Sequence, residues 1–521
     1  MTFTRNKWLL RFGIILLVIV VLGILLNIIL KQKIKSYLSN LPPNVQLELD
    51  DIHVNSFFGH LDLESPDIKV FNTHNPDLEF WMHGGKIEIY GLDYYNLFFN
   101  DKITLDELQF SELEINITKR EVSSSGEKPD ANTGLLNKDI MINKIIIRNS
   151  KAQINEHHGD SIVNLNNFNL DLVGFEMTSD SKTGATYYSY KAMTFDSKAF
   201  VFKTSAYEDI FIDQIELKNN KLKLLEFELK TRYTREELSR ILKTERDHFD
   251  VEVDSIVLNG FSCDFWNLEN SYVAVDSAKI FSPTINVFRD KLVNDNYAIR
   301  PLYGKMLRDL GINLSIDQLN TIDGELSYSE KVKAQNRGGR LDFHNINTAV
   351  YNLGNTYEKD TTRINIRANF MGRSHLDVHW NFVVQNPADD FSFSGELDDF
   401  NVGRISQFSK PNLNVEFRGE LKKTYFNING NPNVSNIDLQ INFEDFEVVV
   451  LKRNGKEKNK FLSSLVNMFV SNNSDKDPNQ FYHGNIDKVE RDKTKSIFNF
   501  VWKNLQSGLL SAMTGSGKKK N

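Results

Sequence analysis

The sequence has almost no cysteine and none of the short motifs that mark common enzyme classes. Cys263 is the only cysteine among 521 residues, so an intramolecular disulfide and zinc sites of the Cys₂His₂ or Cys₄ kind are excluded. G-x-S-x-G and H-E-x-x-H stretches are absent, as is G-x-G-x-x-G before a helix. We therefore predict no enzymatic activity, no catalytic residue, no cofactor and no metal site.

Two histidine pairs are candidate metal ligands by their spacing. His157 and His158 lie in the turn-like stretch EHHGD, where solvated side chains are the common outcome. His375 and His379 have a spacing that suits a metal on a helix, but apolar residues alternate around them. On a strand the two side chains would stand about 13 Å apart and could not share an ion.

Acidic residues outnumber basic ones outside the amino terminus. The first 35 residues hold six basic residues and no acidic one, whereas the remainder holds 56 basic residues against 69 acidic ones. Because nucleic-acid binding needs a surplus of positive charge, this balance argues against nucleic acid as a partner.

Residues 12–30 form the one long apolar run, with Asn27 as its single polar side chain. Nineteen helical residues span nearly 30 Å, the thickness of the hydrocarbon core of a bilayer. Lys31, Lys33 and Lys35 follow directly, where a cleaved signal peptide would have small residues. We predict that residues 1–35 are an uncleaved membrane anchor with a helix at about 12–30. Three basic residues on each side leave its orientation undecided by charge.

The rest of the sequence alternates apolar and polar residues with a period of two, which is typical of half-buried strands. Residues 413–417 and 437–443 are clear examples. Asn219-Asn220, Asp323-Gly324 and Asn429-Gly430 provide turn residues for antiparallel hairpins. The pattern predicts an antiparallel meander, with a weak internal repeat that begins at an Asp or Asn and recurs at about 35 residues or its double.

Helices are few. Thr234 and Glu237 have the spacing of a capping box and predict a helix to about Arg246. Residues 297–310 and 461–470 are candidates for short helices. Residues 496–513 carry apolar side chains at helical spacing and predict an amphipathic helix, followed by a basic tail. We divide the chain into the anchor, 36–250 with a polar loop at 119–138, 251–460, and the helical region 461–521.

So many amphipathic strands need a partner for their apolar faces, and few helices are available to cover them. Roughly 22 to 28 strands would form a ladder on the order of 100 to 130 Å in one sheet, far larger than a closed barrel. A curled groove lined by apolar side chains could hold acyl chains, which gain about 0.8 kcal/mol for each CH₂ removed from water. A closed sandwich core explains any individual strand equally well.

Several stretches resemble the AsmA-like proteins of Gram-negative envelopes, in the form found in Bacteroidetes, and through them the bridge-like lipid-transfer proteins built from repeating β-grooves. The most specific stretch is Ile312–Val350, where a strand pair ending at Glu330 is followed by Gly338-Gly339. The other similar stretches are Ile280–Lys291, Met371–Leu376, Phe393–Leu397 and Arg491–Gly508.

The resemblance implies a mainly β fold: an N-terminal transmembrane helix, then an elongated antiparallel β-groove of taco-like section with few short helices and a C-terminal amphipathic helix. It implies an anchor in the inner membrane, a periplasmic body, phospholipids as ligands, and a role in phospholipid transfer or outer-membrane homeostasis. Outer-membrane or envelope proteins are its expected partners. It supplies no catalytic residue.

We predict the residues of a lipid-lining face from the alternation of apolar side chains along each strand, which places every second residue on the same face. These are Leu326, Tyr328, Leu341, Phe343, Trp380, Phe382, Val415, Phe417, Leu439, Ile441 and Phe443. The C-terminal helix has two interpretations, docking on a bilayer or packing on the last strands. Its predicted docking residues are Phe498, Val501, Trp502, Leu505 and Leu509. A closed-core envelope scaffold is the alternative function, and an enzyme is a third.

Overall fold

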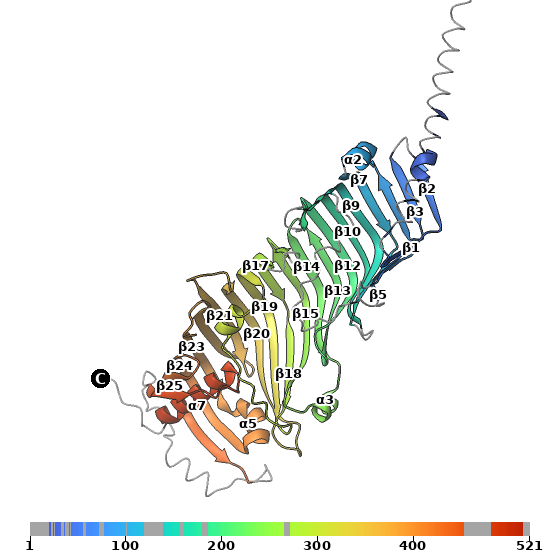
Figure 1. The fold of residues 1–521 in the computed structure, drawn as a ribbon. Helices are drawn as coiled ribbons and strands as arrows, with labels where there is room; N and C mark the ends of the chain where they lie inside the picture. The colour runs from blue at the N-terminus through green and yellow to red at the C-terminus, as the bar shows by residue number, and fades with distance from the viewer. Residues whose placement is uncertain are drawn as a thin grey trace, which may run out of the picture. The chain divides into compact units, whose positions relative to one another are not determined.

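The computed structural model shows a mainly β protein with 26 strands and few helices in its described part (Figure 1). It describes residues 41–513 except 42, 56–58, 72–77, 101, 119–138, 157–160, 180–185, 265–270 and 453–480, together with residues 20, 21, 24, 27–32 and 36. Within these residues, no helix has both the length and the apolar character needed to cross a bilayer. Most of the predicted anchor lies outside the described residues. So do the loop 119–138, the helix 461–470 and the basic tail.

The chain divides into two compact units. Unit 1 contains residues 1–204 and 211–219, and unit 2 contains residues 205–210 and 220–521. The elements of unit 1 are β1 (Val45–Glu48), β2 (Asp51–Asn55), β3 (His60–Glu64), β4 (Asp67–Phe71), β5 (Leu78–His83), β6 (Lys86–Tyr90), α2 (Tyr94–Phe99), β7 (Lys102–Ser111), β8 (Glu114–Thr118), β9 (Asp139–Asn155), β10 (Ser161–Ser179), β11 (Thr186–Ser189) and β12 (Ala192–Lys203). Strand β13 (Glu208–Lys218) contributes residues to both units.

The elements of unit 2 are β14 (Lys221–Thr231), α3 (Arg235–Ile241), β15 (Asp247–Asn259), β16 (Ser262–Asp264), β17 (Tyr272–Phe281), β18 (Thr284–Asp290), α4 (Tyr303–Arg308), β19 (Asn313–Lys331), β20 (Gly339–Gly354), β21 (Thr361–Phe370), β22 (Ser374–Val383), β23 (Phe391–Asn401), the 3₁₀ helix η1 (Val402–Ile405), α5 (Ser406–Leu413), β24 (Val415–Gly430), β25 (Val434–Val450), β26 (Tyr482–Glu490) and α7 (Ile497–Met513).

Consecutive short strands in unit 1 are halves of one bent strand. β7 pairs with residues 139–148 of β9 and β8 with residues 151–155 of the same strand, so β7 and β8 follow β9 around one bend. β6 and β5 pair in turn with β7 and β8. Each of these strands therefore has two arms joined at a bend, and the bends of neighbouring strands adjoin.

Residues with left-handed backbone produce these bends. Glu112 and Asn149, on neighbouring strands, have φ of 56° and 48°. At Gly85, with φ of 65°, an added Cβ would lie 1.8 Å from the Ser111 carbonyl oxygen, so only glycine fits. Asn and Asp tolerate left-handed backbone better than most residues, and residues of these types recur within the long strands of unit 2. Examples are Asp323, Asn345, Asp399 and Asp445.

The sheet pairing is mixed, which corrects the prediction of a wholly antiparallel meander. β7 and β8 are parallel to β9, and β17 and β18 are parallel to β19. Asn219-Asn220 forms a tight turn between β13 and β14 as predicted, with φ of 50° and 59°. The predicted turn at Asp323-Gly324 is wrong, because both residues lie inside β19 at a bend.

Helix positions agree with the sequence in two of three testable places. α3 begins after Thr234 with the predicted reciprocal capping box to Glu237, although it ends earlier than Arg246. α7 spans Ile497–Met513, almost as predicted. Of the predicted helix 297–310, only α4 forms, and residues 291–302 before it lack regular structure.

Candidate functional site

In unit 1, apolar side chains form continuous ladders in which each residue is the direct cross-strand partner of the next. Such pairs are the main side-chain contacts that stabilise a sheet. On one arm the ladders are Ile52–Leu63–Ile87–Phe110–Ile147–Leu170–Phe195 and Val54–Leu61–Ile89–Leu108–Ile145–Leu172–Met193. On the other arm they are Leu47–Ile68–Met82–Ile115–Ala152–Leu165 and Val45–Val70–Phe80–Ile117–Ile154–Val163–Phe202. We call the surface that carries these ladders the ladder face.

The two arms meet along the bend. Met82 from one arm, Ile87 from the other and Leu113 at the bend form a buried cluster. Away from the bend most ladder residues remain half-buried, and Ile117 is 39% exposed. Closely packed cores bury such side chains almost completely, so the described residues of unit 1 leave much of its ladder face uncovered.

Unit 2 continues the same construction over more strands. One ladder crosses eleven strands: Leu222–Leu258–Ala278–Leu319–Val350–Ile364–Trp380–Phe393–Ile428–Ile437–Ile486. A second is Leu229–Val251–Ile285–Leu326–Phe343–Phe370. Phe370 and Ile364 lie on one face of β21, so both ladders belong to the ladder face of unit 2.

The structure places all eleven predicted lining residues on this ladder face. Leu326 pairs with Phe343, and Tyr328 with Leu341. The six half-buried residues are Leu326, Tyr328, Leu341, Phe343, Val415 and Phe417, and the five buried ones are Trp380, Phe382, Leu439, Ile441 and Phe443.

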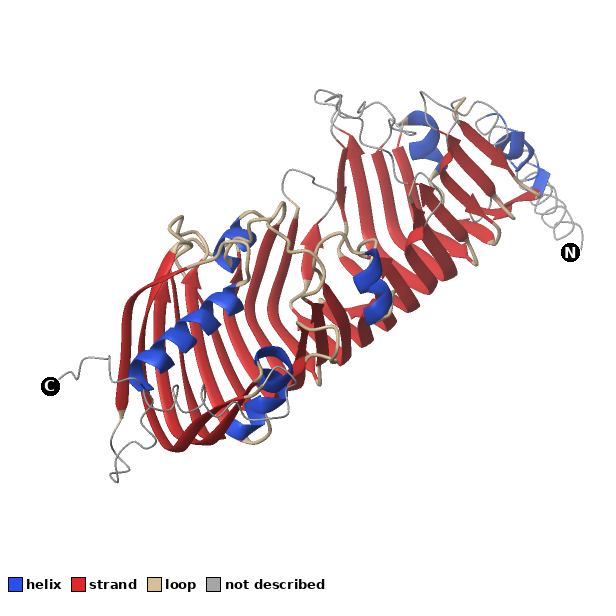
Figure 2. Cartoon of the chain, turned by 90° about the horizontal axis from the view of Figure 1, so that it is seen from below, coloured by secondary structure: helices blue, strands red, loops and turns tan. Residues whose placement is uncertain are grey.

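Helices α4 and α7 explain this difference in burial. α4 and the start of α7 lie against Trp380 and Phe382. α7 then lies across the last strands and contacts β25 and β26 (Figure 2). Its close approach depends on Gly484, where an added Cβ would fall 2.0 Å from the Gly508 carbonyl oxygen. Buried Asn504 accepts a hydrogen bond from the Ser435 hydroxyl at 2.9 Å and donates one to the Phe500 carbonyl. Gly508 of this helix lies close to Leu439, and Leu439, Ile441 and Phe443 on β25 are fully buried.

The five predicted docking residues lie on different sides of α7. Val501 is buried, and Leu505 and Leu509 pack against the core. Phe498 and Trp502 are 57% and 46% exposed. The apolar spacing did not separate these groups, because the helix is apolar on both sides. Sequence reasoning also missed Phe500 on the buried side and Leu510 on the exposed side.

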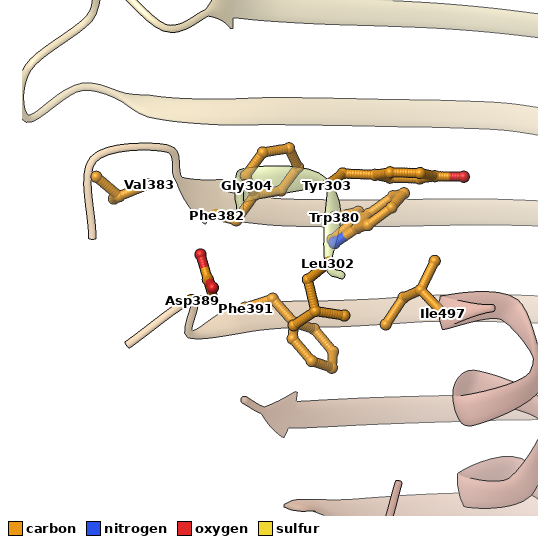
Figure 3. Close-up of a pocket in the computed structure, with 9 residues that line it drawn as sticks. All are labelled: Leu302, Tyr303, Gly304, Trp380, Phe382, Val383, Asp389, Phe391 and Ile497. Carbon is orange, nitrogen blue, oxygen red and sulfur yellow. The ribbon is translucent and has the colours of Figure 1, made fainter. Parts of the chain in front are cut away.

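A small cavity of about 10 Å³ lies where α4 and the start of α7 meet the ladder face. Its lining residues are Leu302, Tyr303, Gly304, Trp380, Phe382, Val383, Asp389, Phe391 and Ile497 (Figure 3). This is close to the minimum space for one water molecule and far too small for a lipid. Sequence reasoning selected Trp380 and Phe382 as lining residues and missed the cavity, whose other walls come from loops and helices.

Charged side chains anchor the segments around α7. The Glu245 carboxylate, 1% exposed, is 2.6 Å from Lys291 Nζ and 3.4 Å from Lys495 Nζ. Burial acts to raise the pKa of Glu245, but the hydrogen bond from Lys291 and the nearby positive charges outweigh it and lower this pKa.

Burial, together with Glu330, raises the pKa of Tyr328, so its hydroxyl stays protonated and donates to Glu330.

One group of potential metal ligands occurs among the described residues, and no sequence pattern indicated it. Oxygen and nitrogen atoms of His60, Asp62 and Glu88 lie within 4.8 Å of one another in unit 1. Lys86 Nζ is 2.7 Å from Glu88 and 3.6 Å from Asp62, and Tyr90 donates to Glu88. These contacts account for the two carboxylates without a metal. His375 and His379 lie on β22, as expected for a strand.

No protein-family model matches the chain, and no curated protein matches it.

Proposed function

We propose that this protein binds the acyl chains of phospholipids on its ladder faces and carries them between the inner and outer membranes of a Gram-negative envelope. In this proposal the amino-terminal segment anchors the protein in the inner membrane and the body lies in the periplasm as an AsmA-like β-groove. The protein performs no catalysis. Its partners are phospholipids and envelope proteins.

The observation that carries the proposal is the continuity of the ladders. In each, every residue is apolar and pairs directly with its neighbours across six to eleven strands. In unit 1 and the first strands of unit 2 most of these side chains are half-buried, although leaving apolar surface in water is unfavourable by about 25 cal/mol per Å². A bound acyl chain would cover this surface without any specific polar group.

The buried end of the ladder face in unit 2 favours the second candidate, a closed-core envelope scaffold without lipid transport. Ile428, Leu439 and Ile441 are fully buried, as in an ordinary protein core. If the rest of the ladder face were covered in the same way, no lipid could bind.

Photo-crosslinking in cells distinguishes the two functions. A diazirine amino acid replaces half-buried Ile147, Leu170 or Phe343 on the ladder faces. Matched controls replace Lys144 and His344, which lie on the opposite faces of β9 and β20. Ile441 is unsuitable because α7 covers it.

Lipid adducts at the three ladder positions and none at the controls are the expected result, since the ladder positions lie within continuous apolar ladders and the two control residues do not. A well-folded protein without adducts at any position would refute lipid binding and support the scaffold.

A further inference from the structure

Trp380 occupies a special position in the eleven-strand ladder. Before it the burial of the ladder is mixed: Leu222, Leu258, Leu319 and Ile364 are half-buried, and Ala278 and Val350 are buried. From Trp380 to Ile437 every ladder residue is at most 8% exposed. The rings of Tyr303 and Phe498 lie 5.3 and 6.2 Å from its ring. Trp380 is therefore the first residue of the continuously buried part of the ladder, which lies beneath the helices.

The indole N–H of Trp380 is buried and has no hydrogen-bond acceptor among the described residues. It lines the cavity, and Figure 3 shows this nitrogen directed toward the other lining residues, while the Tyr303 hydroxyl points away. A buried donor without an acceptor is rare in native proteins and requires an explanation. The cavity has room for about one oxygen atom.

The charges around the cavity define the kind of oxygen it would accept. The one carboxylate in its lining is Asp389, which would repel an anion. The neighbouring Arg308 is held by Asp389 at 2.9 Å and by the carbonyls of Val384 and Asn386. With its donors so engaged, Arg308 does not offer a free cation to a phosphate or a free carboxylate. An uncharged carbonyl remains as the suitable acceptor.

We propose that Trp380 Nε1 is the donor of a carbonyl subsite and binds the ester oxygen of an acyl lipid. This inference depends on the proposed function. The acyl chain would extend from Trp380 along Ile364, Val350 and Leu319. From Trp380 to Leu258 the ladder crosses five strand-to-strand spacings, a distance of about 24 Å. The ladder thus provides room for a long chain whose ester oxygen enters the cavity.

The test compares ester-linked and ether-linked phospholipids with the same chains and headgroup, bound to the full-length protein in mild detergent and counted by native mass spectrometry. Trp380→Phe keeps an aromatic ring and removes the N–H. We expect it to weaken binding of the ester lipid by about 3- to 10-fold, the effect of one hydrogen bond, and to leave the ether lipid unchanged. Trp81→Phe is the matched control, since Trp81 Nε1 donates to Asp67 at 2.8 Å away from the ladder face.

The outcomes separate this inference from the proposed function. Wild-type protein that binds both lipids equally, with no effect of Trp380→Phe on either, would mean that the cavity holds only water, and would overturn the inference alone. Equal losses for both lipids would assign Trp380 a packing role and also overturn it. Wild-type protein that binds neither lipid would overturn the proposed function itself.

Discussion

Glu245 is a single residue on which the position of the C-terminal segment depends. Its carboxylate is nearly inaccessible, and Lys291 and Lys495 reach it from segments far apart in the sequence. Lys495 also contacts Asp295 at 3.1 Å. Lys495 lies just before α7, so this network fixes the start of the helix that covers the end of the ladder face.

Glu245→Gln should destabilise unit 2 by about 1–3 kcal/mol at neutral pH, because it removes the charge partner of Lys291. The folded pKa of Glu245 lies below its ordinary value of 4.5. The stabilisation is therefore present above that value and is lost as the pH falls through the folded pKa. Urea unfolding of wild type and variant at a series of falling pH values checks this, because the difference between them should shrink as Glu245 becomes protonated. Exposed Glu236→Gln is the control, and a wild type whose stability falls no more steeply in acid than that of Glu245→Gln would contradict the prediction.

The face of the strand on which each side chain lies was predictable from the sequence, whereas the degree of its burial was not. Alternation correctly placed Phe343 and Ile441 on the same face, because successive side chains of a strand point to opposite sides. It could not show that Ile441 is fully buried and Phe343 half-buried. That difference comes from α7, which is distant in sequence.

At the level of elements, α7 is positioned by two glycines. The Gly484 Cα on β26 faces the backbone of Gly508 on α7, and no side chain fits between them. The helical spacing of residues 496–513 predicted the helix itself. Its position on β25 and β26 depends on this close approach and on the buried Asn504–Ser435 hydrogen bond, which a one-dimensional pattern does not reveal.

Gly484→Ala should displace α7 and destabilise unit 2 by about 1–3 kcal/mol, the usual effect of overpacking. The displacement would uncover Leu439 and Ile441, so binding of the dye ANS should rise. Gly311→Ala is the matched control, because an added Cβ there meets nothing within 4 Å. Equal unfolding midpoints and equal dye binding for the two variants would show that α7 does not depend on this contact.

The bends and the parallel pairings were the parts of the fold that sequence reasoning missed. Asp323-Gly324 has the composition of a hairpin turn, yet the chain continues through it within β19. Residues with left-handed backbone occur both in hairpin turns and at bends within a strand. The choice between them depends on the neighbouring strands, here β18 and β20, which pair with β19 beyond the bend.

For the whole molecule, the proposed function raises the question of whether lipid bound to one unit depends on the other. Both units carry ladders of the same construction, and β13 contributes residues to each. Under the proposed function lipid enters from the amino-terminal anchor, so we expect it to bind the ladder face of unit 1, which follows the anchor in the chain, before it binds the one that carries Phe343. A carboxylate placed on that face would oppose acyl chains, since a charge is strongly disfavoured in apolar surroundings.

Leu172→Glu should therefore reduce lipid adducts at a photo-crosslinker on Phe343, although the two positions belong to different units. Leu172 is half-buried on the ladder face, while the adjacent Val173 is 40% exposed on the opposite face of β10. Val173→Glu adds the same charge one residue away and should leave the adducts unchanged. Equal adduct yields in both variants would mean that unit 2 takes up lipid independently of unit 1. A loss in Leu172→Glu alone would identify one path that runs through both units.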